Sequence, residues 1–130
     1  MTVLDGPPVR VVLDLSALRA YVAGSVHVGE TIHEVVEDGR FGVPVLAACE
    51  ALVLVSGKDL AMLHRLLALQ RCALLAELPE DLVDLTYWRR VTGRADLAAA
   101  AVVALTYDAP VLTSEGARYG DDVPVLHFPA

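Results

Sequence analysis

The stretch Val9-Arg10-Val11-Val12-Leu13-Asp14 decides the fold of this chain. It is rich in β-branched residues, follows Pro7-Pro8 and ends in a carboxylate, which is typical of a short strand buried on both faces. We expect it to be the first and central strand of a sheet. Ser16 comes soon after it and is predicted to cap a helix that begins at Ala17.

Short apolar segments alternate with helical patterns along the rest of the chain. Apolar residues at helical spacing, or favourable helix starts and stops, predict helices over about 28–38, 47–55, 58–69, 79–93 and 96–107. Extended segments are predicted at 41–46, 110–113 and 123–128, while 72–78 is either a strand or a helix. Such alternation is typical of a parallel sheet covered by helices on both faces. We therefore predict a single α/β domain over residues 1–130, with three layers (α/β/α) and a short parallel sheet of four to five strands.

Composition and charge narrow the class of protein. Hydrophobic residues make up 55% of the chain, which excludes a disordered protein. Charges interrupt every apolar stretch before the ~18 residues of a membrane span. Residues 1–8 lack the basic region and the long apolar segment of a signal peptide, so a cytoplasmic location is expected. The net charge of −7 argues against an obligate nucleic-acid coat protein. It is compatible with an enzyme that handles RNA locally, because bound cations cancel part of a carboxylate cluster.

The sequence argues against a cysteine metal site, a dinucleotide-binding turn and a phosphate-binding loop. Cys49 and Cys72 lack metal-type spacing and have apolar neighbours, so both are interpreted as small core residues. The segment Leu13-Asp14-Leu15-Ser16 has no glycine, which argues against a dinucleotide-binding turn. The segment Ser56-Gly57-Lys58-Asp59 lacks both the upstream glycine and the final Ser or Thr of a phosphate-binding loop.

Four acidic residues stand at the edges of apolar elements: Asp14, Glu50, Asp96 and Glu115. Asp14 and Glu115 follow predicted strands, at the edge where parallel sheets bind ligands. Glu50 has nine apolar neighbours in sequence, and a buried carboxylate there would need a cation or a hydrogen-bond partner. Carboxylates that converge repel one another unless a divalent ion lies between them, and such oxygen ligands suit Mg²⁺ or Mn²⁺.

Each of these residues also has a simpler interpretation. Asp14 and Asp96 would cap helices, Glu50 would lie on an exposed stripe of its helix, and Glu115 would be a solvated turn residue. The order of strand-Asp, helix-Glu, helix-Asp and strand-Thr-x-Glu favours a common site over four separate roles.

Four motifs follow one another in this order: Val11-Val12-Leu13-Asp14-Leu15-Ser16-Ala17-Leu18, Val43-Pro44-Val45-Leu46 with Glu50, Gly93-Arg94-Ala95-Asp96-Leu97-Ala98-Ala99-Ala100, and Ala109-Pro110-Val111-Leu112-Thr113-Ser114-Glu115 with Tyr119. Together they cover nearly the whole chain and resemble the PIN-domain family, which includes the toxin ribonucleases of VapC type. The resemblance implies a site for Mg²⁺ or Mn²⁺ that hydrolyses RNA. Its metal-binding and catalytic residues would be Asp14, Glu50, Asp96 and Glu115, with Ser16 and Thr113 as supporting hydroxyls. It also implies a small antitoxin partner and a homodimer.

One position departs from the family pattern. The family usually has aspartate where this chain has Glu115, and the extra methylene moves the carboxylate by roughly 1.5 Å. The alternative interpretation is therefore a non-catalytic PIN-like binding or regulatory module with a degenerate metal site.

Three arginines precede Asp96: Arg89, Arg90 and Arg94. They would hold substrate phosphates through charge-assisted hydrogen bonds, or they form a solvated helix end that favours the helix dipole. The sequence favours neither interpretation over the other.

Overall fold

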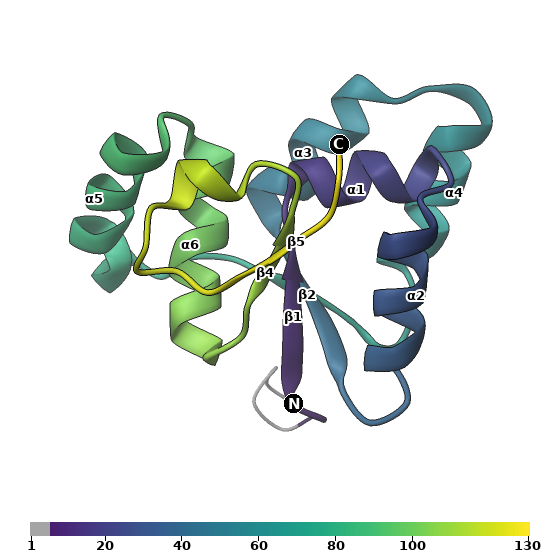
Figure 1. Ribbon diagram of the computed structural model, residues 1–130, viewed down its shortest axis with the longest axis horizontal. Coiled ribbons are helices and arrows are strands. Elements are labelled where there is room, and N and C mark those ends of the chain that lie inside the picture. The colour runs from purple at the N-terminus through teal and green to yellow at the C-terminus, as the bar shows by residue number, and fades with distance from the viewer. Residues whose placement is uncertain (1–5) are drawn as a thin grey trace.

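The computed structural model describes residues 6–130 and contains one five-stranded sheet in the order β3-β2-β1-β4-β5 (Figure 1). All four strand pairs are parallel. The strands are β1 (Val9–Leu13), β2 (Arg40–Pro44), β3 (Cys72–Leu75), β4 (Val111–Thr113) and β5 (Val125–His127). β1 lies at the centre, as predicted. The chain builds outward from β1 to β3 on one side and then crosses to β4 and β5 on the other, so the strand order reverses between β1 and β4.

Helices cover both faces of this sheet, which confirms the predicted α/β fold of three layers (Figure 1). In Figure 1, α5 and α6 lie on one side of the sheet, and α1, α2 and α4 lie on the other. The helices are α1 (Leu15–Val22), α2 (Val26–Val35), α3 (Val45–Leu54), α4 (Gly57–Leu67), α5 (Leu82–Thr92) and α6 (Ala95–Tyr107), with short 3-10 turns η2 (Pro79–Asp81) and η3 (Gly116–Tyr119).

The alternation of side chains along β1 divides the core in two. Val12 belongs to the cluster that packs under α5 and α6, whereas Val11 and Leu13 belong to the cluster under α1, α2, α3 and α4. All three side chains are at most 1% exposed. Full burial of a Val or Leu side chain stabilises the fold by about 1.5–3 kcal/mol, so β1 contributes to both halves of the core.

α6 is buried along most of its length, from Asp96 to Ala104. A helix that is apolar on all sides is enclosed by other elements rather than lying at the surface. Its alanines have small side chains, which allow it to pack closely against the sheet and against α5. Gly93 ends α5 in the left-handed region at φ +82°, as expected for a residue without a Cβ. Only Gly93 and Arg94 separate α5 from α6, and this short connection brings Arg94 to the start of α6.

Several local predictions need correction. The N-cap of α1 is Asp14 rather than Ser16, because the Asp14 side chain accepts a hydrogen bond from the Ala17 backbone N–H. The ambiguous segment 72–78 is a strand only over Cys72–Leu75, and the helix predicted over 79–93 is divided into η2 and α5.

The two cysteines differ in burial. Cys49 is exposed on α3, so its predicted place in the core is wrong. Cys72 is half-buried, and burial raises the pKa of its thiol to about 12. In the part of the chain from residue 6 onward, no helix is long and apolar enough to cross a membrane. The prediction that the first eight residues are not a signal peptide falls mainly on residues 1–5, which lie outside the described residues.

Candidate functional site

Three of the four predicted carboxylates converge at the carboxyl-terminal edge of the sheet. Asp14 directly follows β1, and Glu115 comes two residues after the end of β4. The register pairs Leu13 with Leu112, which sets the ends of these neighbouring strands side by side. Asp96 lies in the first turn of α6. The phenol of Tyr119 has a raised pKa because it is buried and because the charges of Asp14, Asp96 and Glu115 all act on it.

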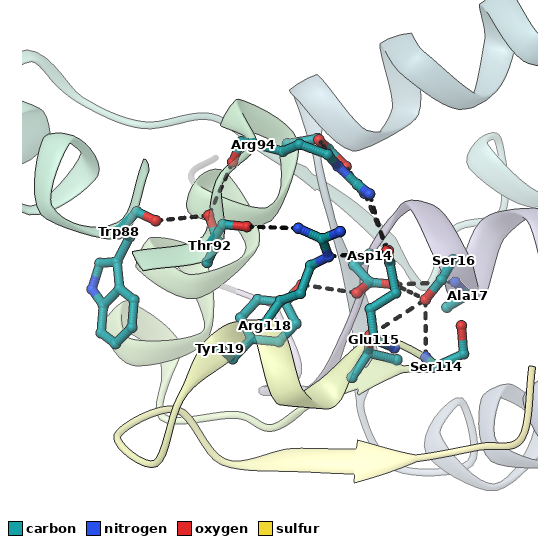
Figure 2. Close-up of polar contacts among 12 residues, drawn as sticks. Asp14, Ser16, Ala17, Trp88, Thr92, Arg94, Ser114, Glu115, Arg118 and Tyr119 are labelled. Carbon is teal, nitrogen blue, oxygen red and sulfur yellow. Dashed lines mark hydrogen bonds and ion pairs between the residues drawn. The ribbon is translucent and has the colours of Figure 1, made fainter. Parts of the chain in front are cut away.

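Asp14 is fully buried, and each of its carboxylate oxygens has a hydrogen-bond partner (Figure 2). Oδ1 accepts from the Ser16 hydroxyl at 2.6 Å and from the Ala17 backbone N–H at 3.1 Å. Oδ2 accepts from the Tyr119 hydroxyl at 2.8 Å. Burial nevertheless raises the pKa of Asp14, because the loss of water outweighs these hydrogen bonds, which lower it. The side chain therefore both caps α1 and belongs to the site.

The two predicted supporting hydroxyls join the ends of β1 and β4. Ser16 Oγ accepts from the Ser114 backbone N–H at 3.0 Å and lies 3.3 Å from Thr113 Oγ1. Thr113 Oγ1 in turn accepts from the Glu115 backbone N–H at 2.8 Å. These contacts fix the loop that carries Glu115 against the Asp14 turn.

Arg94 binds two carboxylates at once. Its Nε and Nη2 donate to Asp96 Oδ1 and Oδ2 at 3.1 and 2.9 Å. Its Nη1 and Nη2 donate to Glu115 Oε1 and Oε2 at 3.0 and 3.1 Å. The hydrogen bond to Asp96 is the largest cause of the raised pKa of Arg94. A second arginine, Arg118, places its Nε 3.6 Å from Glu115 Oε1. Arg94 is thus a partner of the carboxylates, a role that its place among three arginines did not reveal.

Glu50 does not join this cluster. Its side chain is exposed on α3 and forms no hydrogen bond or ion pair with any residue from 6 to 130. Of the two interpretations of Glu50, the exposed stripe of its helix is confirmed, because the buried side of α3 consists of Ala47, Ala48 and Ala51. Water compensates the Glu50 carboxylate instead.

The other two arginines remain at the surface. Arg89 and Arg90 are exposed in the last turn of α5, where a positive charge favours the helix dipole. Neither forms an ion pair with a described residue. Tyr119 was part of the fourth motif but was given no role in the site, and Arg118 was missed. The only signal for Arg118 was its position shortly after the end of β4.

The carboxylates fit a divalent ion in chemistry but not in their present arrangement. Oxygen ligands of this kind are those that Mg²⁺ prefers. Hydrogen-bond donors hold both oxygens of Asp14, however, and Arg94 holds those of Asp96 and Glu115. Across residues 6–130, no group of three or more His, Cys, Asp or Glu side chains is disposed to hold a metal ion. A divalent ion would therefore require these side chains to rearrange.

A pocket of about 730 Å³ opens beside the cluster. Ser16, Arg94 and Glu115 line it on the side of the site, and Arg19 lines it from α1. The last residues of the chain, Phe128, Pro129 and Ala130, form another part of its wall. The pocket therefore has both acidic and basic groups, and Arg94 belongs to both the carboxylate cluster and the pocket.

The fold is similar to that of a solved structure, a toxin-antitoxin complex from Klebsiella pneumoniae. The TM-score is 0.73 at 11% sequence identity, and the match covers 92% of this chain and 99% of the other. A likeness at this level of identity concerns the fold alone. No protein-family model matches the sequence, and no curated protein matches it.

Proposed function

We propose that this chain is a PIN-type endoribonuclease that depends on Mg²⁺ or Mn²⁺ and acts as the toxin of a toxin–antitoxin pair. The convergence of Asp14, Asp96 and Glu115 carries this proposal. These carboxylates meet beyond the carboxyl ends of parallel strands, where the strand order reverses, and open parallel sheets bind their ligands in such crevices. Such a crevice can serve many functions, and the similarity to a chain of a toxin-antitoxin complex supports the choice of a toxin.

The pocket beside the cluster supports RNA as the substrate. Its wall contains Arg19, whose guanidinium group suits phosphate oxygens, beside Arg94, which is paired with Asp96 and Glu115. Arg89 and Arg90 are exposed at the end of α5 and offer further contacts for a phosphate backbone. A chain with a net charge of −7 needs such local positive groups to hold RNA, because its overall field repels a polyanion.

The surface of α5 supports a protein partner. Leu82, Val83, Tyr87 and Val91 are all exposed large apolar side chains of this helix. Apolar surface that gathers on one element marks an interaction site more often than a neutral part of the surface. We assign this face of α5 to a homodimer and leave the acidic site and its pocket to RNA and the antitoxin.

The decisive experiment measures Mn²⁺ binding and RNA cleavage by the full chain. Wild type should bind Mn²⁺ in calorimetry and cleave RNA in a reaction that EDTA stops. The double variant Asp14→Asn with Asp96→Asn should lose both. A matched control is Asp121→Asn with Asp122→Asn, which removes the same charge from two exposed residues before β5. Equal, negligible heats for wild type and the site variant would exclude the metal site.

The toxin role has a separate test. Expression of the chain should arrest growth, and co-expression of the neighbouring small reading frame should relieve the arrest. If expression does not affect growth, the toxin assignment is wrong. RNA cleavage would still be tested by the assay above.

A second candidate function is a non-catalytic PIN-like binding or regulatory module. Arg94 favours it, because its guanidinium pairs with both Asp96 and Glu115 without an ion. Glu115 in place of the usual aspartate and the exposed Glu50 point in the same direction. RNA binding without EDTA-sensitive cleavage would identify this module.

A further inference from the structure

One guanidinium group satisfies two acidic side chains at the centre of the site. Each of the four carboxylate oxygens of Asp96 and Glu115 accepts a hydrogen bond from Arg94 (Figure 2 shows Arg94 directed toward Glu115). Asp96 is only 7% exposed, and a carboxylate buried to this extent needs a cation or several donors beside it. Arg94 supplies both requirements.

A divalent ion and Arg94 would compete for these oxygens. Both are cations, and both would approach the lone pairs of Asp96 and Glu115. Bringing an ion next to a guanidinium costs Coulomb energy that grows in a partly buried site, where the effective dielectric constant is lower than in water. A divalent ion and the Arg94 guanidinium would therefore oppose each other at these carboxylates.

We propose that Arg94 is a resident cation that holds Asp96 and Glu115 together until a divalent ion displaces it. This inference rests on the proposed function, because it assumes that Mg²⁺ or Mn²⁺ uses the same carboxylates. It explains why carboxylates that suit Mg²⁺ or Mn²⁺ in chemistry are arranged here around a guanidinium group.

Displacement of Arg94 moves its side chain and leaves its backbone in place. Its backbone forms the N-cap of α6, and its backbone O accepts from the Thr92 hydroxyl at 3.1 Å and from the Ala98 N–H at 3.0 Å. The side chain, in contrast, is 37% exposed and lines the 730 Å³ pocket. The guanidinium thus has space to turn away from the carboxylates and into the pocket while α6 stays in place.

The inference is tested by Mn²⁺ titration of the full chain as wild type, Arg94→Gln and Arg65→Gln. Arg65 is an exposed arginine in the last turn of α4 and controls for the loss of one positive charge. Arg94→Gln should bind Mn²⁺ at least about tenfold more tightly than wild type, since a competing cation is gone, whereas Arg65→Gln should match wild type. Tenfold corresponds to ~1.4 kcal/mol.

The outcomes separate the inference from the proposed function. If wild type and Arg94→Gln bind Mn²⁺ with the same affinity, the metal site stands and the displacement model is wrong. If neither binds Mn²⁺, the displacement model is wrong as well, and the proposed Mg²⁺ or Mn²⁺ dependence falls with it.

Thermal unfolding provides a second readout that needs no RNA. Arg94→Gln should have a lower Tm than wild type in EDTA, because Asp96 loses its cation, and Mn²⁺ should raise its Tm more than it raises that of wild type. A purely structural ion pair would give the lower Tm without the larger recovery, and that result would overturn the inference. Arg94→Lys keeps a positive charge but lacks the guanidinium fork. It replaces Arg94→Gln in both measurements if the glutamine variant does not fold.

Discussion

The hydroxyl of Tyr119 donates a hydrogen bond of 2.8 Å to Oδ2 of Asp14, across 105 positions of sequence. Both residues are fully buried. The contact links the turn after β1 to η3 after β4, so the two chain segments that carry Asp14 and Glu115 are held by one buried bond. It also supplies Oδ2 of Asp14 with a hydrogen-bond donor, whereas Oδ1 accepts from Ser16 and Ala17.

Tyr119→Phe should destabilise the fold. It leaves a buried carboxylate oxygen without its donor, and a hydrogen bond to a charged group contributes about 1.5–3 kcal/mol. Urea unfolding should show a loss of this size in the free energy of unfolding. Tyr87→Phe removes the same atom from a side chain that is 52% exposed and should change stability by less than about 0.5 kcal/mol. Equal effects of the two changes would show that the buried hydrogen bond from Tyr119 to Asp14 adds nothing to the free energy of unfolding.

The raised pKa of Asp14 predicts how stability depends on pH. The ordinary pKa is 3.8 and burial raises it in the folded state, so the folded chain binds this proton more tightly than the unfolded chain. The free energy of unfolding therefore increases as the pH falls through the raised pKa, and this gain levels off near the ordinary value. Asp14→Asn removes the titrating group and serves as the reference. Urea unfolding between pH 7 and pH 4 should show wild type gaining stability relative to Asp14→Asn; a constant difference would contradict the raised pKa.

The position of Asp14, Asp96 and Glu115 could be predicted from sequence because strand ends and helix starts are local features. Residues that come at or just after the ends of neighbouring parallel strands lie at the same edge of the sheet. Asp96 joins them because α6 begins at that edge. The central place of β1 follows similarly from a segment that is apolar on both faces.

Glu50, Arg94 and Tyr119 could not be placed in this way. The segment around Glu50 is apolar on every side, so its sequence does not tell which side of α3 is buried, and Ala47, Ala48 and Ala51 form that side. Arg94 reaches Glu115 and Tyr119 reaches Asp14 only after the sheet has formed. Such contacts depend on tertiary packing, which no local pattern records.

Val83→Asp should weaken a dimer formed through α5. Val83 is 79% exposed on the apolar face of this helix, so the fold itself should tolerate the change. A charge in an apolar interface would be desolvated without a partner, which opposes association. Light scattering should show a shift of mass from dimer toward monomer for Val83→Asp. The control is Val53→Asp on α3, which is 76% exposed and should leave the mass unchanged. A reversed result would move the interface to α3.

Glu115→Asp should strengthen Mn²⁺ binding and raise metal-dependent RNA cleavage. The shorter side chain withdraws its carboxylate by roughly 1.5 Å. It then no longer meets Arg94 while Arg94 stays bound to Asp96, so the guanidinium is held from one side only. A weaker hold on Arg94 favours the divalent ion, and a gain of about 1.4 kcal/mol would appear as a tenfold lower Kd.

Glu115→Gln separates this effect from simple loosening of Arg94. It keeps the length of the side chain but removes the charge. The interaction of Arg94 with position 115 is then weaker, and one acidic metal ligand is lost at the same time. We expect its Mn²⁺ affinity not to exceed that of wild type, whereas Glu115→Asp should exceed both. Calorimetry gives the three affinities, and cleavage of RNA with and without EDTA gives the matching rates. If aspartate at this position changes neither quantity, the Glu115 carboxylate is peripheral and the competition is confined to Asp96 and Arg94.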